Sequence, residues 1–133
     1  MEKDISLVSS DYDIVYMFGI DKKLIDTVRI ETCAKYNNEL VYTGFDIHYL
    51  EVRLRSIGIT CITSNKPTCY LCNAAYYHML KKNLNTVFIH IPSLKGMSIE
   101  LMNKLIKVFD DVYFDEKCES SKSYEKLPKI SRM

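Results

Sequence analysis

The sequence lacks a charge imbalance, an apolar run of membrane-spanning length and any internal repeat. Its 18 basic and 17 acidic residues leave a net charge of +1, which gives no electrostatic basis for binding nucleic acid or an anionic membrane. No apolar run approaches the length that crosses a bilayer, and Met1-Glu-Lys-Asp4 does not resemble a secretory signal. We therefore expect no nucleic-acid partner, no membrane partner and a cytoplasmic location.

Cysteine is also too sparse for a small secreted scaffold held by disulfides. The five cysteines, an odd number, favour reduced thiols in a cytosolic compartment. Zinc is not expected, because no second ligand pair stands at a suitable spacing and the three histidines are scattered. We expect no metal and no other cofactor.

What the sequence does contain is enough for one globular domain. The chain has 133 residues, of which 47% are hydrophobic and 26% charged, and it can bury a sizeable core. From residue 115 the composition becomes charged and rich in serine. We therefore predict a single domain over residues 1–114 and a flexible tail over residues 115–133.

Apolar runs and helical spacing alternate along the chain. Strands are predicted at residues 13–18, 59–63 and 86–91, an extended segment at 24–33 and a loop at 35–39. Helices are predicted after the N-caps Asp46, Thr68 and Ser98, and the first of them should end at Gly58. Residues 112–114 read as a short strand or the anchor of a helix end. This alternation is typical of an α/β fold with helices layered on a largely parallel sheet.

Three residues with useful chemistry follow the predicted strands. Cys72 falls in the first turn of the helix after Pro67, where exposed N–H groups and the helix dipole stabilise a thiolate. His90 and Glu31 lie near the ends of two extended segments. Because the carboxyl ends of parallel strands meet at one edge of a sheet, we expect all three at that edge. The alternatives are an inert buried cysteine, a core histidine and a surface carboxylate.

The windows around these residues resemble the type I pyroglutamyl peptidases, cytosolic cysteine peptidases that remove an N-terminal pyroglutamate. Residues 67–77, Pro-Thr-Cys-Tyr-Leu-Cys-Asn-Ala-Ala-Tyr-Tyr, resemble the cysteine motif of the family and place the nucleophile at Cys72. Phe88-Ile-His-Ile-Pro-Ser93 resembles its histidine segment, and Ile30-Glu-Thr-Cys-Ala-Lys35 its glutamate segment. The resemblance implies a three-layer helix/sheet/helix fold and a triad of Cys72, His90 and Glu31. The opening strand and the pocket loop of the family have no counterpart here.

The resemblance implies a thiol hydrolase whose substrate is a peptide or small amide. Cys72 would attack the carbonyl, His90 would move the proton and Glu31 would orient the imidazole. Two other readings stay open. Cys69-Tyr-Leu-Cys72 is a C-x-x-C at a helix start, as in thiol–disulfide oxidoreductases. An inactive relative could instead serve as an interaction module, and a homodimer would then cover the sheet edge that the missing strand exposes.

Overall fold

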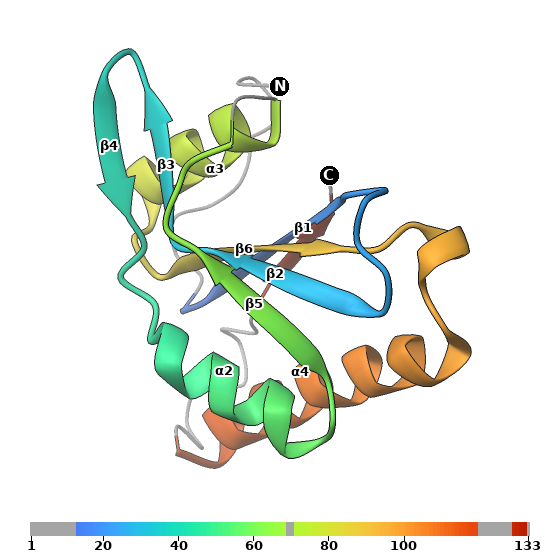
Figure 1. Ribbon diagram of the computed structural model, residues 1–133. Helices are drawn as coiled ribbons and strands as arrows, with labels where there is room; N and C mark the ends of the chain where they lie inside the picture. The colour runs from blue at the N-terminus through green and yellow to red at the C-terminus, as the bar shows by residue number, and fades with distance from the viewer. Residues whose placement is uncertain (1–12, 69–70, 120–128, 133) are drawn as a thin grey trace.

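The computed structural model describes residues 13–68, 71–119 and 129–132, which form a mixed sheet with three helices (Figure 1). The sheet has the order β5-β2-β6-β1-β7. Its strands are β1 (Val15–Ile20), β2 (Thr27–Glu31), β5 (Thr60–Ser64), β6 (Thr86–Ile91) and β7 (Lys129–Arg132). β1 is parallel to β6 and β7, β2 is parallel to β5, and only the β2–β6 pair is antiparallel. The predicted α/β class with a mostly parallel sheet is confirmed.

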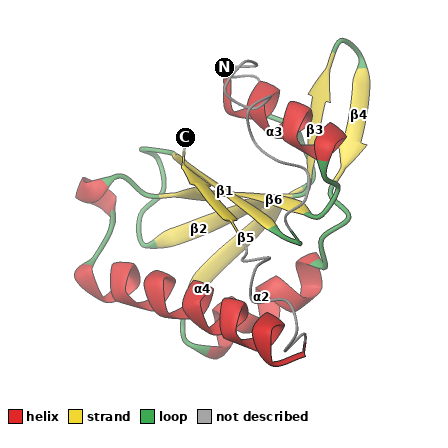
Figure 2. Cartoon of the chain, turned by 180° about the vertical axis from the view of Figure 1, so that it is seen from behind, coloured by secondary structure: helices red, strands yellow, loops and turns green. Residues whose placement is uncertain are grey.

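Helices lie on both faces of this sheet. α2 (Ile47–Ser56) and α4 (Ile99–Glu119) pack on one face, and α3 (Leu71–Lys82) lies on the other (Figures 1 and 2). Alternation along β1 divides its side chains between the two layers: Tyr16 joins the core under α2 and α4, while Val15 and Met17 join the core under α3. β1 and β6 are therefore buried on both faces, as their continuous apolar runs predict.

The predicted loop at residues 35–39 is wrong. Cys33–Tyr36 (β3) and Glu39–Tyr42 (β4) form a two-stranded antiparallel hairpin beside α3. Asn37 and Asn38 turn it with φ values of 48° and 66°, a conformation that asparagine tolerates better than most residues. The predicted extended segment at 24–33 therefore divides between β2 and this separate hairpin.

Two of the three predicted helix caps are confirmed. Asp46 Oδ1 accepts a hydrogen bond from the Tyr49 amide at 3.0 Å, and Ser98 Oγ accepts one from the Leu101 amide at 3.0 Å. Gly58 follows the end of α2 with φ of 84°, which a side chain would resist. Leu71 is the first residue of α3 that the structure describes, and residues 69–70 lie outside the described part of the chain, so the Thr68 cap stays a prediction.

The segment predicted as a tail contains regular structure. α4 continues to Glu119, so residues 112–114 lie inside a helix and not in a strand. β7 pairs in parallel with β1, from Val15 opposite Lys129 to Phe18 opposite Arg132. The β1 edge is thus occupied by the same chain, which removes the reason given for a homodimer at that edge; the dimer itself stays a prediction. Among the described residues, no helix is long and apolar enough to cross a membrane.

Candidate functional site

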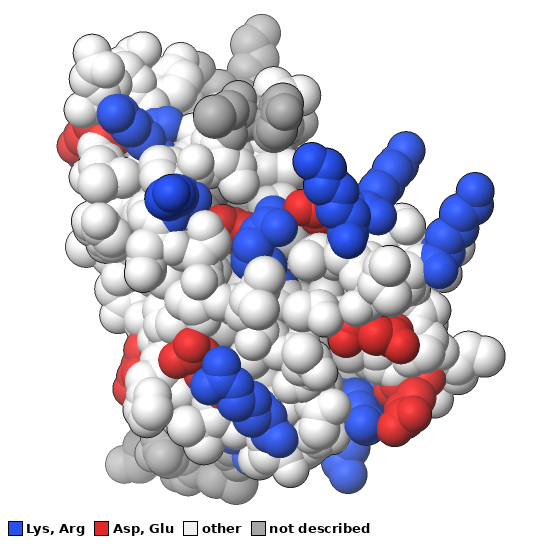
Figure 3. All heavy atoms as spheres, viewed as in Figure 1, with Lys and Arg blue, Asp and Glu red and all other residues white. Residues whose placement is uncertain are grey.

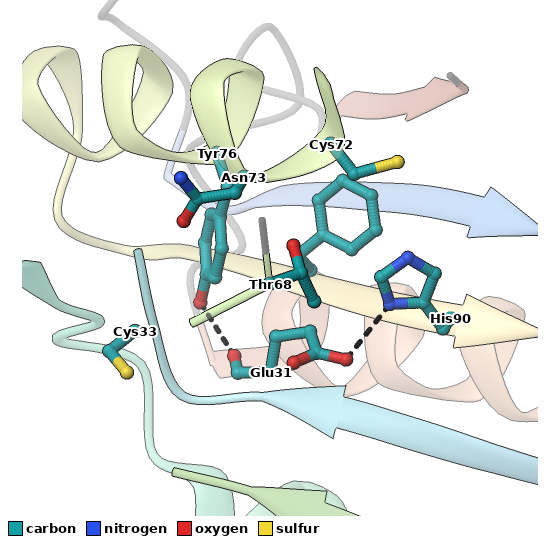
Figure 4. Close-up of a pocket in the computed structure, with 8 residues that line it drawn as sticks. Glu31, Cys33, Thr68, Cys72, Asn73, Tyr76 and His90 are labelled. Carbon is teal, nitrogen blue, oxygen red and sulfur yellow. Dashed lines mark hydrogen bonds and ion pairs between the residues drawn. The ribbon is translucent and has the colours of Figure 1, made fainter. Parts of the chain in front are cut away.

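Glu31 and His90 form a buried hydrogen-bonded pair in the middle of the sheet. Glu31 Oε2 lies 2.9 Å from His90 Nδ1, and the two residues are 3% and 5% exposed. Because an ionised carboxylate only accepts hydrogen bonds, Nδ1 is the nitrogen that donates to Glu31, and in the neutral ring Nε2 then keeps its lone pair. Figure 4 shows this second ring nitrogen directed to the side on which Cys72 lies. The pair therefore holds the imidazole in the tautomer that a general base requires.

The sheet brings this pair together by a route that differs from the predicted one. β2 runs antiparallel to β6, so the carboxyl ends of these two strands do not meet at one edge. Arg29 is opposite His90, and Glu31 is opposite Phe88. Residues two apart on a strand share a face, so Glu31 reaches His90 diagonally from the same side of the sheet.

Arg29 completes a row of charges that the sequence analysis missed. Its Nε donates to Glu31 Oε2 at 2.6 Å, and its Nη1 lies 2.9 Å from Asp21 Oδ2. Arg29 thus bonds the same carboxylate oxygen of Glu31 that bonds His90. The pKa of Asp21 is lowered, first by a hydrogen bond from the Lys23 amide and also by Arg29. The two-residue spacing of Arg29 and Glu31 was the available signal, since it places both side chains on one face of β2.

Basic side chains also lie at the end of the sheet where β1 and β6 finish. Lys22, Lys23 and Lys95 are exposed in the connections that follow β1 and β6. Figure 3 shows lysine and arginine side chains gathered on this part of the surface. Acidic side chains lie among them, including Asp21 and the exposed Asp26 in the connection after β1.

Cys72 lines the same pocket as the Glu31–His90 pair (Figure 4). Its lining is closely packed and leaves no space for a water molecule; the gaps between its atoms add up to about 170 Å³ only when adjoining open solvent is included. No hydrogen bond joins the thiol to His90 among the described contacts. Burial raises the pKa of the Cys72 thiol, and the charge of Glu31 adds to this rise. The predicted position in the first turn of α3 is correct, but the surroundings favour the thiol over the thiolate.

The backbone beside Cys72 is closely packed. A Cβ on Gly19 would lie 2.8 Å from two ring atoms of Phe88 and 3.3 Å from Cys72 Sγ. Gly19 stands opposite His90 in the parallel pairing of β1 and β6. The absence of a side chain at Gly19 is therefore what lets the Phe88 ring and the thiol occupy this position.

The remaining wall of the pocket is built around Tyr76. Its hydroxyl donates to the main-chain oxygen of Glu31 at 2.8 Å, and burial raises its pKa. Asn73, one turn earlier on α3, bonds the main chain of Lys35 in β3 through both amide atoms. α3 is thereby fixed to both β2 and the hairpin. The other lining residues are Cys33, Thr68 and Phe88.

Cys33 and Cys61 are free and buried, and burial raises the pKa of each. Cys69, the partner in the C-x-x-C reading, lies outside the described residues. Among the residues that the structure describes, no group of three or more His, Cys, Asp or Glu side chains could hold a metal ion.

The three predicted site residues thus line one pocket, and two of them are bonded to each other. Arg29, Tyr76 and Phe88 were not predicted, and each contacts or supports that pair. Searches for similar proteins add no further information about the site. No family model, no curated protein and no solved structure matches this chain.

Proposed function

We propose that the pocket is the catalytic centre of a cysteine hydrolase acting on small amides or the ends of peptides, of the pyroglutamyl peptidase type. The observation that carries the proposal is the Glu31–His90 bond of 2.9 Å in a pocket that Cys72 also lines. A carboxylate on Nδ1 leaves Nε2 able to take a proton, and a thiol near Nε2 is the group that needs such a base.

In each half of the reaction, His90 takes up one proton and then gives it back. His90 Nε2 takes the Cys72 proton as Sγ attacks the amide carbonyl and forms a carbon–sulfur bond. The carbon–nitrogen bond then breaks, and the amine leaves with the proton from His90. Water next attacks the thioester, His90 takes a proton from that water, and the thiol is restored as the acid departs. Glu31 stabilises the imidazolium formed in each half.

A base beside the thiol matters here because the isolated thiol is not activated. The raised pKa of Cys72 leaves little thiolate at neutral pH. The Cys72 proton therefore has to move to His90 as Sγ attacks the amide carbonyl. For this to happen, the side chain of Cys72 must turn to bring Sγ within hydrogen-bond reach of Nε2. Catalytic hydrogen bonds often form only once substrate is bound, so the unbonded thiol is compatible with this role.

The test is release of a fluorescent amine from a pyroglutamyl amide, with Cys72→Ala as the control. Release by the unaltered protein and its loss in Cys72→Ala would support the proposal. His90→Ala should abolish release as fully as Cys72→Ala, since the two act as one unit. Release that survives Cys72→Ala would contradict it, as would an inactive protein whose Cys72 is alkylated no faster than Cys33.

A second candidate is a binding protein that keeps the pocket and does not turn over substrate. The observation in its favour is the Cys72 thiol, whose pKa is raised and which has no bond to His90. For this candidate, a pyroglutamyl amide should bind equally to the unaltered protein and to Cys72→Ala, with no amine released from either. Calorimetry on both proteins distinguishes the candidates.

A further inference from the structure

A fixed positive charge lies beside the Glu31–His90 pair. The Nε atom of Arg29 donates to Glu31 Oε2 at 2.6 Å, and His90 Nδ1 lies 2.9 Å from the same oxygen. Oε1, the other carboxylate oxygen, is buried and has no hydrogen-bond partner in the part of the chain that the structure describes. Arg29 and His90 therefore share one oxygen of Glu31, and each affects how strongly the other is bound.

Arg29 also lies next to His90 itself. The two residues are directly opposite in the antiparallel pairing of β2 and β6, which places their Cβ atoms about 4.5–5.5 Å apart. Like charges at opposite positions of two strands repel each other. Because a guanidinium group is always protonated in proteins, Arg29 opposes the addition of a proton to the His90 ring.

Asp21 lies at the outer end of this row of charges. Its Oδ2 lies 2.9 Å from Arg29 Nη1, and its amide donates to the main-chain oxygen of Ile91, the residue after His90. The side chains of Arg29 and Asp21 are 21% and 23% exposed, so both are nearer to solvent than the buried pair. The negative charge of Asp21 offsets part of the effect that Arg29 has on His90.

The other titratable groups that line the pocket are neutral at ordinary pH. His90 lies on the α3 side of the sheet, where it lines the pocket (Figure 4). Burial raises the pKa of each titratable group that faces it there from α3 and the hairpin: Cys33, Cys72 and Tyr76. Among the described residues around the ring, the charged groups that influence its protonation are therefore Glu31, Arg29 and Asp21.

We propose that Arg29 favours the unprotonated form of the His90 ring by supplying the positive charge that the buried Glu31 carboxylate requires, and that Asp21 limits this effect. A buried carboxylate needs a positive partner. Without Arg29, that partner would be the imidazolium form of His90, in which both ring nitrogens donate and neither accepts. Arg29 acts through His90 and is thus a positioning residue. The inference rests on the proposed function only for the use of the neutral ring, since a ring that already holds a proton cannot take one from Cys72.

The test follows the protonation of the histidine rings by NMR as a function of pH, on the full-length protein labelled with ¹⁵N-histidine. In Arg29→Gln, the midpoint at which His90 takes a proton should rise by about 1–3 pH units, the usual effect of one nearby charge. Arg29→Lys keeps the charge and should leave the midpoint near that of the unaltered protein. Asp21→Asn should lower the midpoint, and by less, because the Asp21 carboxylate is bonded to Arg29.

Arg55→Gln provides the matched control. Arg55 lies on α2, which packs on the opposite face of the sheet, and its side chain is 59% exposed. The substitution removes the same charge from the molecule, and the His90 midpoint should not move. His48, whose side chain is 86% exposed, is an internal reference in the Arg29 and Asp21 variants.

Each outcome supports or overturns the inference. A rise in Arg29→Gln that is absent from Arg29→Lys and Arg55→Gln supports it. An unchanged or lowered midpoint in Arg29→Gln, an equal rise in either of the other two variants, or a His90 ring that titrates in none of them overturns it. If Arg29→Gln does not fold, Asp21→Asn decides: a lowered midpoint supports the inference, and an unchanged one overturns it. The expected shifts without amide cleavage by the unaltered protein defeat the hydrolase and leave the inference standing, whereas cleavage with an unchanged midpoint does the reverse.

Discussion

Gly19→Ala should disturb the pocket from the backbone side. The added methyl would lie 2.8 Å from Phe88 Cε1 and Cζ, and 3.3 Å from Cys72 Sγ. Phe88 is 1% exposed and its ring is enclosed by the core under α3, so it cannot swing into solvent. The ring or β1 itself must move to relieve the overlap.

The cost can be worked from these contacts. Overpacking of a dense core costs about 1–3 kcal/mol. Alanine has less conformational freedom than glycine in the unfolded chain, which offsets about 0.4–1 kcal/mol of this cost. The middle of these two ranges gives a net loss of about 1.3 kcal/mol in the free energy of unfolding, or roughly 4–7 °C in Tm for a chain of this length. The methyl also covers a half-buried thiol, so alkylation of Cys72 should become slower.

Gly58→Ala provides a matched control. Its φ of 84° strains any side chain by about 1–2 kcal/mol, while the nearest atom to its Cβ is the movable end of Lys104. Thermal unfolding and mass-spectrometric alkylation rates are measured on both variants. Slower alkylation of Cys72 should occur only in Gly19→Ala. Unchanged stability and unchanged alkylation in Gly19→Ala, or equal slowing in both, would refute the packing argument.

Three further predictions follow from the site and the caps. The rate of Cys72 alkylation should rise with pH through a pKa above the ordinary thiol value. Glu31→Gln should lower that pKa, because it removes a nearby negative charge, and rate–pH profiles of both proteins measure the difference. Tyr76→Phe leaves the Glu31 main-chain oxygen without its donor and should cost about 1–3 kcal/mol in denaturant unfolding; an unchanged midpoint would contradict this. Asp46→Ala should cost about 1 kcal/mol by the same assay, while Asp46→Ser should retain most of the stability.

Residues with strong local patterns were predicted well. The runs at β1 and β6, the Asp46 cap and the glycine after α2 each depend on nearby sequence, and the structure has them where expected. The hairpin was missed because its strands are only four residues long and β4 is largely exposed, which leaves little apolar periodicity. The pair Asn37-Asn38 was the one available signal, since both can adopt positive φ.

Strand direction was the part of the site that the sequence could not provide. The apolar pattern of β2 is the same whether it runs parallel or antiparallel to β6, because side chains alternate in either case. The pairing of Arg29 with His90 depends on that direction and on a register fixed by distant residues. Burial of the Cys72 thiol likewise depends on Phe88 and β1, which are far from it in the chain.

The pairing of β2 with β6 also has a consequence for the order of folding. Glu31 and His90 are separated by 59 positions, and α2, β5 and α3 all lie between them in the chain. When residues so far apart in the sequence come together, the chain loses loop-closure entropy before the contact stabilises the fold, and this slows folding. We expect the helices to form early and the imidazole–carboxylate bond to appear with the last, slowest phase of refolding. Formation of the Glu31–His90 bond would then show that the sheet is complete.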